Sequence, residues 1–185
     1  MFPFRILHAA ALTAALFSQA AADSTQVRDA LVPALIAGQP APDFSLPNQA
    51  GEETSLKGYR GHWIVLYFYP RDFSRGCTIE AHNFQRDSAQ YAALDAVILG
   101  VSMDSSASHR GFCDKEGLAF KLLADTSGRV SALYNSVKEW DGRRMSARNT
   151  FLIDPKGDIA RVFLGVKPDV HSAEVIAALR ELRRK

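Results

Sequence analysis

The segment that most constrains the fold is the apolar run HWIVLYFYP, residues 62–70, which ends at a proline. Its β-branched and aromatic residues are typical of a strand buried on both faces of a sheet. A short loop of charged and small residues follows, and Cys77 then stands where a helix begins, with apolar residues at helical spacing as far as Leu94. Open α/β sheets place ligand sites beyond the carboxyl ends of their strands. This junction is therefore the first candidate for a functional site.

The remaining segments extend this pattern into one α/β domain. DFSL and ETSL, separated by NQAG, predict an N-terminal β-hairpin. AVILGVSM predicts a second buried strand, and the helix after it is expected to begin at Asp104 or Ser105 and to stop at Gly117. The later segments are a short strand, a short helix, a hairpin around DPKG and a C-terminal helix: FKLLAD, SGRVSALYNS, NTFLIDPKGDIARVFLG and HSAEVIAALRELRRK. We expect a mixed central β-sheet flanked by helices.

The N-terminus has the layout of a secretory signal peptide. Arg5 precedes an apolar stretch, and Ala20 and Ala22 form an A-x-A pattern. The stretch is shorter than the ~20 residues that a membrane-spanning helix needs. An uncleaved anchor or an ordinary buried helix are the alternatives. We expect cleavage near Ala22, an exported protein that is periplasmic or secreted, a leader over residues 23–36 and one domain over residues 37–185.

Composition excludes several other classes. With 47% hydrophobic and 23% charged residues, the 185-residue chain is typical of a globular protein. A net charge of +2 is too small to indicate a nucleic-acid partner. No later segment is long and apolar enough to span a bilayer, so no stable membrane association is expected. The two cysteines lie far apart and the five histidines are scattered, so we expect no metal site. No bound organic cofactor is expected either.

Cys77 and Cys113 are the only cysteines, and their chemistry is open from the residues alone. Dithiol exchange of the thioredoxin kind usually needs Cys-x-x-Cys, whereas Glu80 stands at the fourth position here. In an exported protein, a structural disulfide between the two cysteines is the default. The other possibility is a nucleophilic thiolate, because unpaired N–H groups and the dipole at a helix N-terminus favour the anion.

The stretch YFYPRDFSRGCTIEA resembles the active-site loop of peroxiredoxins of the PrxQ group, also called bacterioferritin comigratory protein. The family pattern Pro-x-x-x-Thr/Ser-x-x-Cys is met by Pro70, Ser74 and Cys77. GQPAPDFSLPNQAGEETSLKGYRGHWIVLYFYP resembles the opening hairpin and first core strand of the family, and ARNTFLIDPKGDIARVF resembles the later strand pair that carries its arginine, here Arg148. The resemblance runs from about Ala37 to the C-terminus and implies a thioredoxin-like fold.

By this resemblance the chain is a thiol-dependent peroxidase that reduces hydrogen peroxide and organic hydroperoxides. Cys77 would be the peroxidatic nucleophile and become a sulfenic acid. Arg148 would stabilise the thiolate and polarise the O–O bond, Ser74 would align the peroxide, and Pro70 would shield the thiolate from water. Glu80 would orient an arginine, although an acid is also favourable in a first helical turn without any such role.

Two neighbouring arginines compete with Arg148 for its role. Arg143 and Arg144 lie close in sequence, and Arg148 is preferred because it directly precedes the strand NTFLID. The segment NSVKEWDGRRMSARNT is also shorter than in many members of the family, so the wall of the site that it forms is not defined by the resemblance.

Many PrxQ proteins place a resolving cysteine five positions after the peroxidatic one, where this chain has His82. A second branch places it in the following helix, and Cys113 lies in that expected helix, 36 residues after Cys77. The resemblance implies that Cys113 attacks the sulfenic acid to form an intramolecular disulfide. Because a disulfide needs Cα atoms within about 4.4–6.8 Å, we expect local unwinding around both cysteines. The alternative for Cys113 is a small buried hydrophobe.

The family also implies a partner. A thioredoxin-like protein would restore the dithiol, and after export it must itself be an exported reductant. A monomer is expected. Two alternative functions stay open: an exported thiol–disulfide oxidoreductase or redox sensor on the same fold, and a non-enzymatic exported domain with a structural disulfide.

Overall fold

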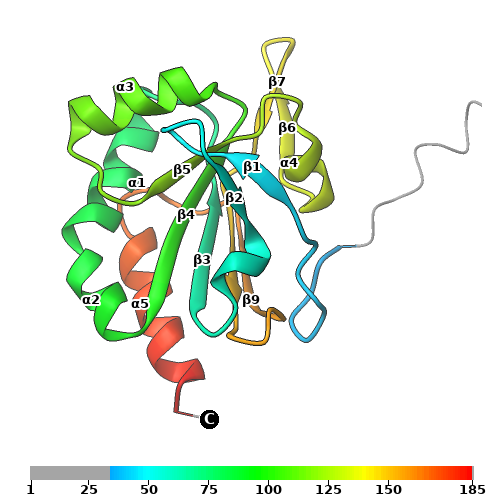
Figure 1. Cartoon of the computed structure of the whole chain (residues 1–185), viewed down its shortest axis with the longest axis vertical. Coiled ribbons are helices and arrows are strands. Elements are labelled where there is room, and N and C mark those ends of the chain that lie inside the picture. Colours follow the sequence, from blue (N-terminus) through cyan, green and yellow to red (C-terminus); the bar gives the residue numbers. More distant parts are fainter. Residues whose placement is uncertain (1–33, 185) are drawn as a thin grey trace, which may run out of the picture. The chain divides into compact units, whose positions relative to one another are not determined.

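A five-stranded sheet organises residues 34–184, the part of the chain that the computed structural model describes (Figure 1). The strand order is β5-β4-β3-β8-β9, with β3 (Trp63–Phe68) at the centre. β4 (Ala96–Ser102) runs parallel to β3, and β5 (Lys121–Ala124) parallel to β4. β8 (Asn149–Ile153) runs antiparallel to β3, and β9 (Ile159–Leu164) antiparallel to β8. The predicted mixed sheet is confirmed. The predicted signal peptide, its cleavage site and nearly all of the predicted leader lie outside the described residues.

β3 is buried along its whole length because it packs on both faces. Val65 and Tyr67 belong to one hydrophobic cluster, and Leu66 and Phe68 belong to the other. Alternate side chains of a strand point to opposite faces, so this continuous apolar run fills two cores at once. The predicted buried strand is confirmed, and it fixes the position of the loop that follows it.

Helices cover one face of the sheet, and the N-terminal hairpin with two short helices covers the other (Figure 1). The first layer consists of α1 (Arg75–Arg86), α2 (Ser88–Ala93), α3 (Ser106–Glu116) and α5 (His171–Leu182). The second layer consists of β1 (Ser45–Pro47), β2 (Glu53–Ser55), the 3-10 helix η2 (Leu56–Tyr59) and α4 (Arg129–Leu133). β1 and β2 pair antiparallel, as predicted for the N-terminal hairpin.

The helix expected from Cys77 to Leu94 is interrupted at Asp87. The backbone of Asp87, with φ −91° and ψ 7°, ends α1 and begins α2. Its carboxylate accepts hydrogen bonds from Arg86 and from the hydroxyl of Ser172, at 2.7 Å for the latter. The break therefore lets one acidic side chain tie α1 to the start of α5, a contact that helical spacing does not reveal.

The caps of α3 agree with the sequence. Ser105 is the N-cap, and its hydroxyl accepts a hydrogen bond from Ser108 N at 3.2 Å. Gly117 ends the helix in the left-handed conformation at φ 66°, where a residue without a side chain is favoured. Cys113 lies between these caps and is one of the buried residues of α3.

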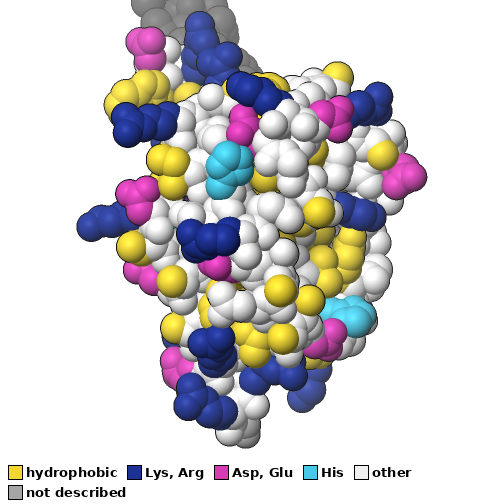
Figure 2. Space-filling model, turned by 90° about the vertical axis from the view of Figure 1, so that its left-hand side faces the viewer, with side chains coloured by type: hydrophobic (Ala, Val, Ile, Leu, Met, Phe, Trp, Pro, Cys, Tyr) yellow, Lys and Arg dark blue, Asp and Glu magenta, His cyan; other side chains and the backbone are white. Residues whose placement is uncertain are grey.

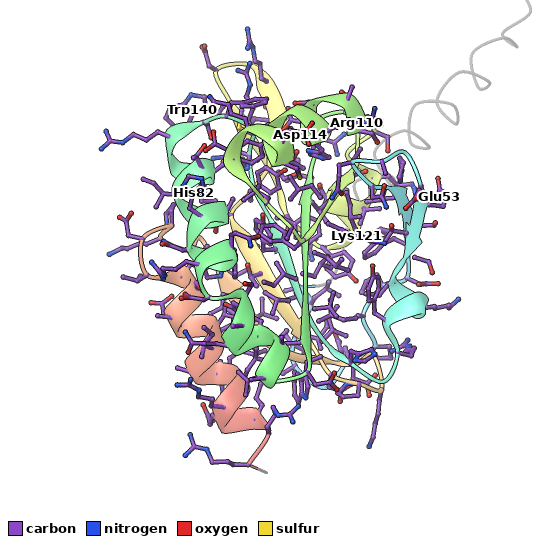
Figure 3. The ribbon with its side chains drawn as sticks, turned by 60° about the vertical axis from the view of Figure 1, so that its left-hand side comes forward. Glu53, His82, Arg110, Asp114, Lys121 and Trp140 are labelled. Atoms are coloured by element: carbon purple, nitrogen blue, oxygen red, sulfur yellow. The ribbon has the colours of Figure 1, made fainter. Side chains whose placement is uncertain are left out.

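A small hairpin that was not predicted follows α4. β6 (Val137–Trp140) pairs antiparallel with β7 (Arg143–Ser146), and both turn residues, Asp141 and Gly142, have positive φ. An Asp-Gly turn between two short segments is a recognised hairpin signal, so the sequence contained the information. Trp140 projects from this hairpin and is 70% exposed (Figure 3).

The surface is mixed in character. On the face shown in Figure 2, Lys and Arg side chains are scattered among acidic and apolar ones. Within residues 34–184, none of the helices has the length and apolar character needed to cross a bilayer.

Candidate active site

Cys77 lies in the first turn of α1, directly after the loop that follows β3. The helix begins at Arg75 with Ser74 as N-cap, and its first hydrogen bond runs from Thr78 N to Ser74 O at 2.9 Å. The N–H groups before Thr78 therefore have no carbonyl partner inside the helix and lie at the positive end of its dipole. The Ser74 side chain does not cap them, and its Oγ donates to Arg71 O at 3.0 Å. An anionic sulfur is favoured at this position.

Arg148 is the cation that contacts Cys77. Its Nη2 donates to Cys77 Sγ at 3.2 Å. Arg148 directly precedes β8, and the register of β8 with β3 pairs Thr150 with Tyr67. The antiparallel pairing therefore carries Arg148 past the end of β3, to the side on which Cys77 lies. Arg143 and Arg144 lie in β7 instead.

Gly76 makes room for the guanidinium. A Cβ atom added at Gly76 would lie 2.8 Å from Arg148 Nη2 and 3.7 Å from the ring of Pro168. The first of these distances is shorter than any ordinary van der Waals contact. A side chain at this position would therefore force the Arg148 guanidinium to shift from its place beside the sulfur.

Glu80 holds Arg148 from the other side. Its Oε2 accepts from Arg148 Nη1 at 2.6 Å, and the Glu80 side chain is only 1% exposed. Arg148 thus uses one terminal nitrogen for the carboxylate and the other for the sulfur. A guanidinium offers several donors in a fixed plane, so this double contact fixes its orientation.

His171 completes this chain of contacts and was not predicted. Its Nδ1 lies 2.9 Å from Glu80 Oε1, and the imidazole is fully buried against the rings of Phe84 and Phe163. Its Nε2 has no hydrogen-bond partner among the described residues. His171 is the first residue of α5, 91 positions after Glu80, and nothing in the local sequence marks it for this contact.

The loop between β3 and α1 forms one wall of a pocket of about 280 Å³. Pro70 is half-buried at the start of this loop, and Ser74 is half-buried at its end. Ser74 is among the residues that line the pocket, which are Arg71, Asp72, Phe73, Ser74, Asp104 and Ser108.

Cys113 is buried in α3 and, like Cys77, is a free thiol. Burial raises the pKa of Cys113 to about 11, and the carboxylates of Asp72 and Asp114 add to the effect. The folded state therefore keeps Cys113 as a neutral thiol, which is a weak nucleophile. Figure 3 marks α3 by Asp114 and α1 by His82, the two helices that carry the cysteines.

A buried polar network that was not predicted lies between the loop and α3. Asp72 is 3% exposed, and its carboxylate accepts from the hydroxyls of Tyr69 and Ser108, each at 2.7 Å. His109 Nδ1 lies 2.9 Å from the same carboxylate. Burial alone would raise the pKa of Asp72, but the hydrogen bonds from these three groups, together with the charge of His109, hold it below its usual value.

A thioredoxin-like sheet that places a buried cysteine at a helix start, beside an arginine that directly precedes the neighbouring strand, defines the peroxiredoxin class. Comparison with known proteins agrees. The AhpC/TSA family matches residues 37–162. The chain is 40% identical over 155 residues to peroxiredoxin Bcp of Bacillus subtilis (strain 168), covering 80% of this chain and 97% of that one. It is 41% identical over 146 residues to a putative peroxiredoxin bcp of Coxiella burnetii, covering 77% and 97%.

Solved structures give the same result. Peroxiredoxin Q of Xanthomonas campestris has a TM-score of 0.73 at 36% identity, covering 78% of this chain and 97% of that one. A cysteine-to-serine mutant of Xylella fastidiosa PrxQ has a TM-score of 0.76 at 31% identity, covering 80% and 96%. The chain belongs to the AhpC/TSA family and is a thiol peroxidase of the Bcp/PrxQ peroxiredoxin type.

Proposed function

We propose that this peroxidase uses Cys77 as the nucleophile that attacks the peroxide, with Arg148 as its main electrostatic partner. The observation that carries the proposal is the 3.2 Å contact between Arg148 Nη2 and Cys77 Sγ, while Nη1 of the same guanidinium is held by Glu80. A fixed cation beside the sulfur favours the thiolate and remains in place as charge moves in the transition state.

In the first step, the Cys77 thiolate attacks the terminal oxygen of a hydroperoxide. An S–O bond forms, the O–O bond breaks, and sulfur gives two electrons to the peroxide. The leaving oxygen takes up a proton and departs as water or an alcohol, and Cys77 is left as a sulfenic acid. Arg148 stabilises the negative charge as it passes from sulfur to the leaving oxygen.

Ser74 and Pro70 are proposed to shape the approach of the peroxide. The Ser74 hydroxyl is half-buried at the helix start and donates to Arg71 O, so its lone pairs are available to accept from a peroxide O–H. Pro70 has no N–H and limits water near the sulfur.

Hydrogen peroxide and organic hydroperoxides are the proposed substrates. A solved structure of Xanthomonas campestris bacterioferritin comigratory protein, 34% identical, is described by its alkyl peroxide reduction activity.

Cys113 is proposed as the resolving cysteine. Its sulfur attacks the sulfenic acid of Cys77, the S–S bond forms, and the hydroxyl leaves as water with the proton of the Cys113 thiol. Two solved mutants of the Xanthomonas campestris protein replace cysteines that are 36 positions apart, the same separation as Cys77 and Cys113. The two cysteines lie in separate helices, α1 and α3, and both are buried and free, so local unwinding of the two segments is proposed to precede this step.

A thioredoxin-like exported protein is proposed to reduce the disulfide, giving two electrons and two protons and becoming a disulfide itself. The proposal of export depends on the signal-peptide pattern of the first 22 residues, and a monomer is proposed from the family resemblance. Expression of the full chain in a bacterium, followed by fractionation and mass measurement, tests export. Recovery of the whole uncleaved chain in the cytoplasm would contradict it.

The nucleophile is tested by peroxide consumption with dithiothreitol as reductant. The wild type is expected to consume hydrogen peroxide in many turnovers, and Cys77→Ser is expected to consume none above buffer. A matched Cys113→Ser variant should retain turnover, because the small thiol reductant reaches the sulfenic acid directly. Consumption by Cys77→Ser at the wild-type rate would overturn the assignment.

A further inference from the structure

The Asp72–His109 pair joins the two segments that carry the cysteines. Asp72 lies in the loop five residues before Cys77, and His109 lies one helical turn before Cys113 in α3. His109 Nδ1 is 2.9 Å and 3.2 Å from the two carboxylate oxygens of Asp72, and the His109 side chain is fully buried. Because an ionised carboxylate only accepts, Nδ1 is the donor in this contact.

The pair is the centre of a larger buried attachment. Ser108, beside His109 on α3, donates to the same carboxylate at 2.7 Å, and Tyr69 at the end of β3 does so at 2.7 Å. The backbone N–H of Asp72 donates to Asp104 Oδ2 at 2.9 Å, just before α3 begins. Asp72 therefore connects the loop both to the end of β3 and to α3.

Phe73 shows that the loop is held in a strained conformation. Its φ is 58°, in the left-handed region that residues with a side chain rarely adopt. Its ring packs on Phe112 with centroids 5.1 Å apart, and Lys115 Nζ lies 5.5 Å from its centre. Strain of this kind persists only while neighbouring contacts hold the backbone. Release of the Asp72 attachment therefore favours relaxation of the loop away from α3.

We propose that the Asp72–His109 contact is a latch that positions the active-site loop for attack on peroxide and sets the rate at which Cys113 reaches the Cys77 sulfenic acid. The inference rests on the proposed function, in which Cys113 is the resolving thiol. The latch is closed during the first step and must open for the second. Asp72 and His109 are positioning residues, because neither contacts the sulfur of Cys77.

The latch also affects how much of Cys77 is oxidised further, to the sulfinic acid. While it is closed, the sulfenate of Cys77 stays in the site that activates peroxide. It then attacks a second peroxide, forming another S–O bond as the O–O bond breaks, and becomes a sulfinic acid with release of water or alcohol. Slower opening of the latch therefore increases inactivation of the enzyme by oxidation of Cys77 at high peroxide, and faster opening decreases it.

The test separates the two steps by rapid mixing of reduced protein with one equivalent of hydrogen peroxide, acid quench and intact mass measurement. His109→Leu removes the donor, whereas His109→Asn keeps an N–H donor near the position of Nδ1. His109→Leu is expected to convert sulfenic acid to disulfide about tenfold faster than wild type, since a hydrogen bond to a charged group is lost. His109→Asn is expected to restore the slower rate.

Two further variants keep the test decisive if His109→Leu folds poorly. Ser108→Ala removes one hydrogen bond to Asp72 without emptying the core, and a smaller increase in the same rate is expected. His82→Asn breaks a contact between α1 and α3, His82 Nε2 to Glu116 Oε2 at 2.9 Å. No change is expected because the His82 side chain is 48% exposed and ion pairs that reach solvent contribute little.

Tyr134→Phe controls for a general loss of stability. It removes a hydrogen bond to Pro42 O, 2.7 Å long, on the opposite face of the sheet, and should leave the rate of disulfide formation unchanged.

The outcomes distinguish this inference from the proposed function. Disulfide formation at the wild-type rate in both His109→Leu and Ser108→Ala would overturn the latch while leaving the resolving role of Cys113 intact. An equal acceleration in His82→Asn or Tyr134→Phe would also overturn it. If no disulfide forms in the wild type, the resolving role itself fails. At a large excess of peroxide, the fraction of Cys77 converted to sulfinic acid should be lower in His109→Leu than in the wild type. An unchanged or higher fraction would contradict the latch.

Discussion

Gly76 and Arg148 approach each other so closely that a methyl group on Gly76 would lie 2.8 Å from Nη2 of the guanidinium. The same nitrogen contacts Cys77 Sγ at 3.2 Å. The absence of a side chain at Gly76 therefore leaves the guanidinium its present place beside the sulfur.

Gly76→Ala is expected to displace Arg148 and to slow oxidation of Cys77 by hydrogen peroxide roughly tenfold to a hundredfold, because a preorganised donor is moved. The helix itself should not be weakened, since Ala is a better helix former than Gly, so a fall in melting temperature would report displacement of Arg148 from Glu80. Stopped-flow measurement of the second-order rate constant checks this. Gly58→Ala, where the added Cβ meets only Ser55 Oγ at 3.6 Å, is the matched control. Equal rates for Gly76→Ala and Gly58→Ala would disprove the steric argument.

Glu80→Gln is expected to reduce both stability and activity. The buried carboxylate binds Arg148 at 2.6 Å and His171 at 2.9 Å, so its loss leaves two donors without their charged acceptor. Breaking a buried pair of this kind costs about 3 to 5 kcal/mol in the free energy of unfolding. Urea unfolding and the rate of Cys77 oxidation are the measurements. Asp95→Asn, which weakens the exposed contact with His62 at 2.7 Å, should change neither. Unchanged oxidation in Glu80→Gln would show that Arg148 needs no carboxylate to hold it.

Ser74→Ala is expected to lower the rate of Cys77 oxidation about tenfold or more, because a hydrogen-bond partner for the peroxide is removed. Ser74→Thr keeps the hydroxyl and adds a methyl group that limits its rotamers, so its rate should equal or exceed that of the wild type. Both variants are compared by the same stopped-flow assay. A rate in Ser74→Ala that matches Ser74→Thr would remove the hydroxyl from the mechanism.

The pKa of Cys113 gives a prediction for pH. The folded-state value of about 11 lies above the ordinary value of 9.0, so the folded state retains the proton. The stability that this contributes is fully present below pH 9.0 and is lost as the pH rises through about 11. In reduced Cys77→Ser, alkylation of Cys113 by iodoacetamide should therefore rise with pH toward about 11. The same protein in urea should show the rise near pH 9.0. A rise near pH 9.0 in the folded protein would contradict the effect of burial.

The parts of the fold that depend on local pattern were predictable. The apolar run of β3, the caps of α3 at Ser105 and Gly117, and the position of Cys77 at a helix start each follow from a few adjacent residues. The β6–β7 hairpin was missed although Asp141 and Gly142 carry its signal. Its strands are short and partly exposed, and they lack the alternation of apolar and polar residues that predicts a strand.

The contacts that hold the site together were not predictable in the same way. His171 meets Glu80 across 91 positions, and His109 meets Asp72 across 37. A histidine at a helix start or on a helix face looks the same whether it is exposed or buried against a carboxylate. Only the packing of α1 with α5 and of the active-site loop with α3 brings these partners together.

The central claim is that Cys77 is oxidised by peroxide and that Cys113 then closes a disulfide with it. Its most direct test is the intact mass of reduced protein after one equivalent of hydrogen peroxide, compared between wild type and Cys113→Ser. The account predicts loss of two hydrogens in the wild type and gain of one or more oxygens in Cys113→Ser. If both proteins gain the same number of oxygens, Cys113 takes no part in the reaction and the account is contradicted.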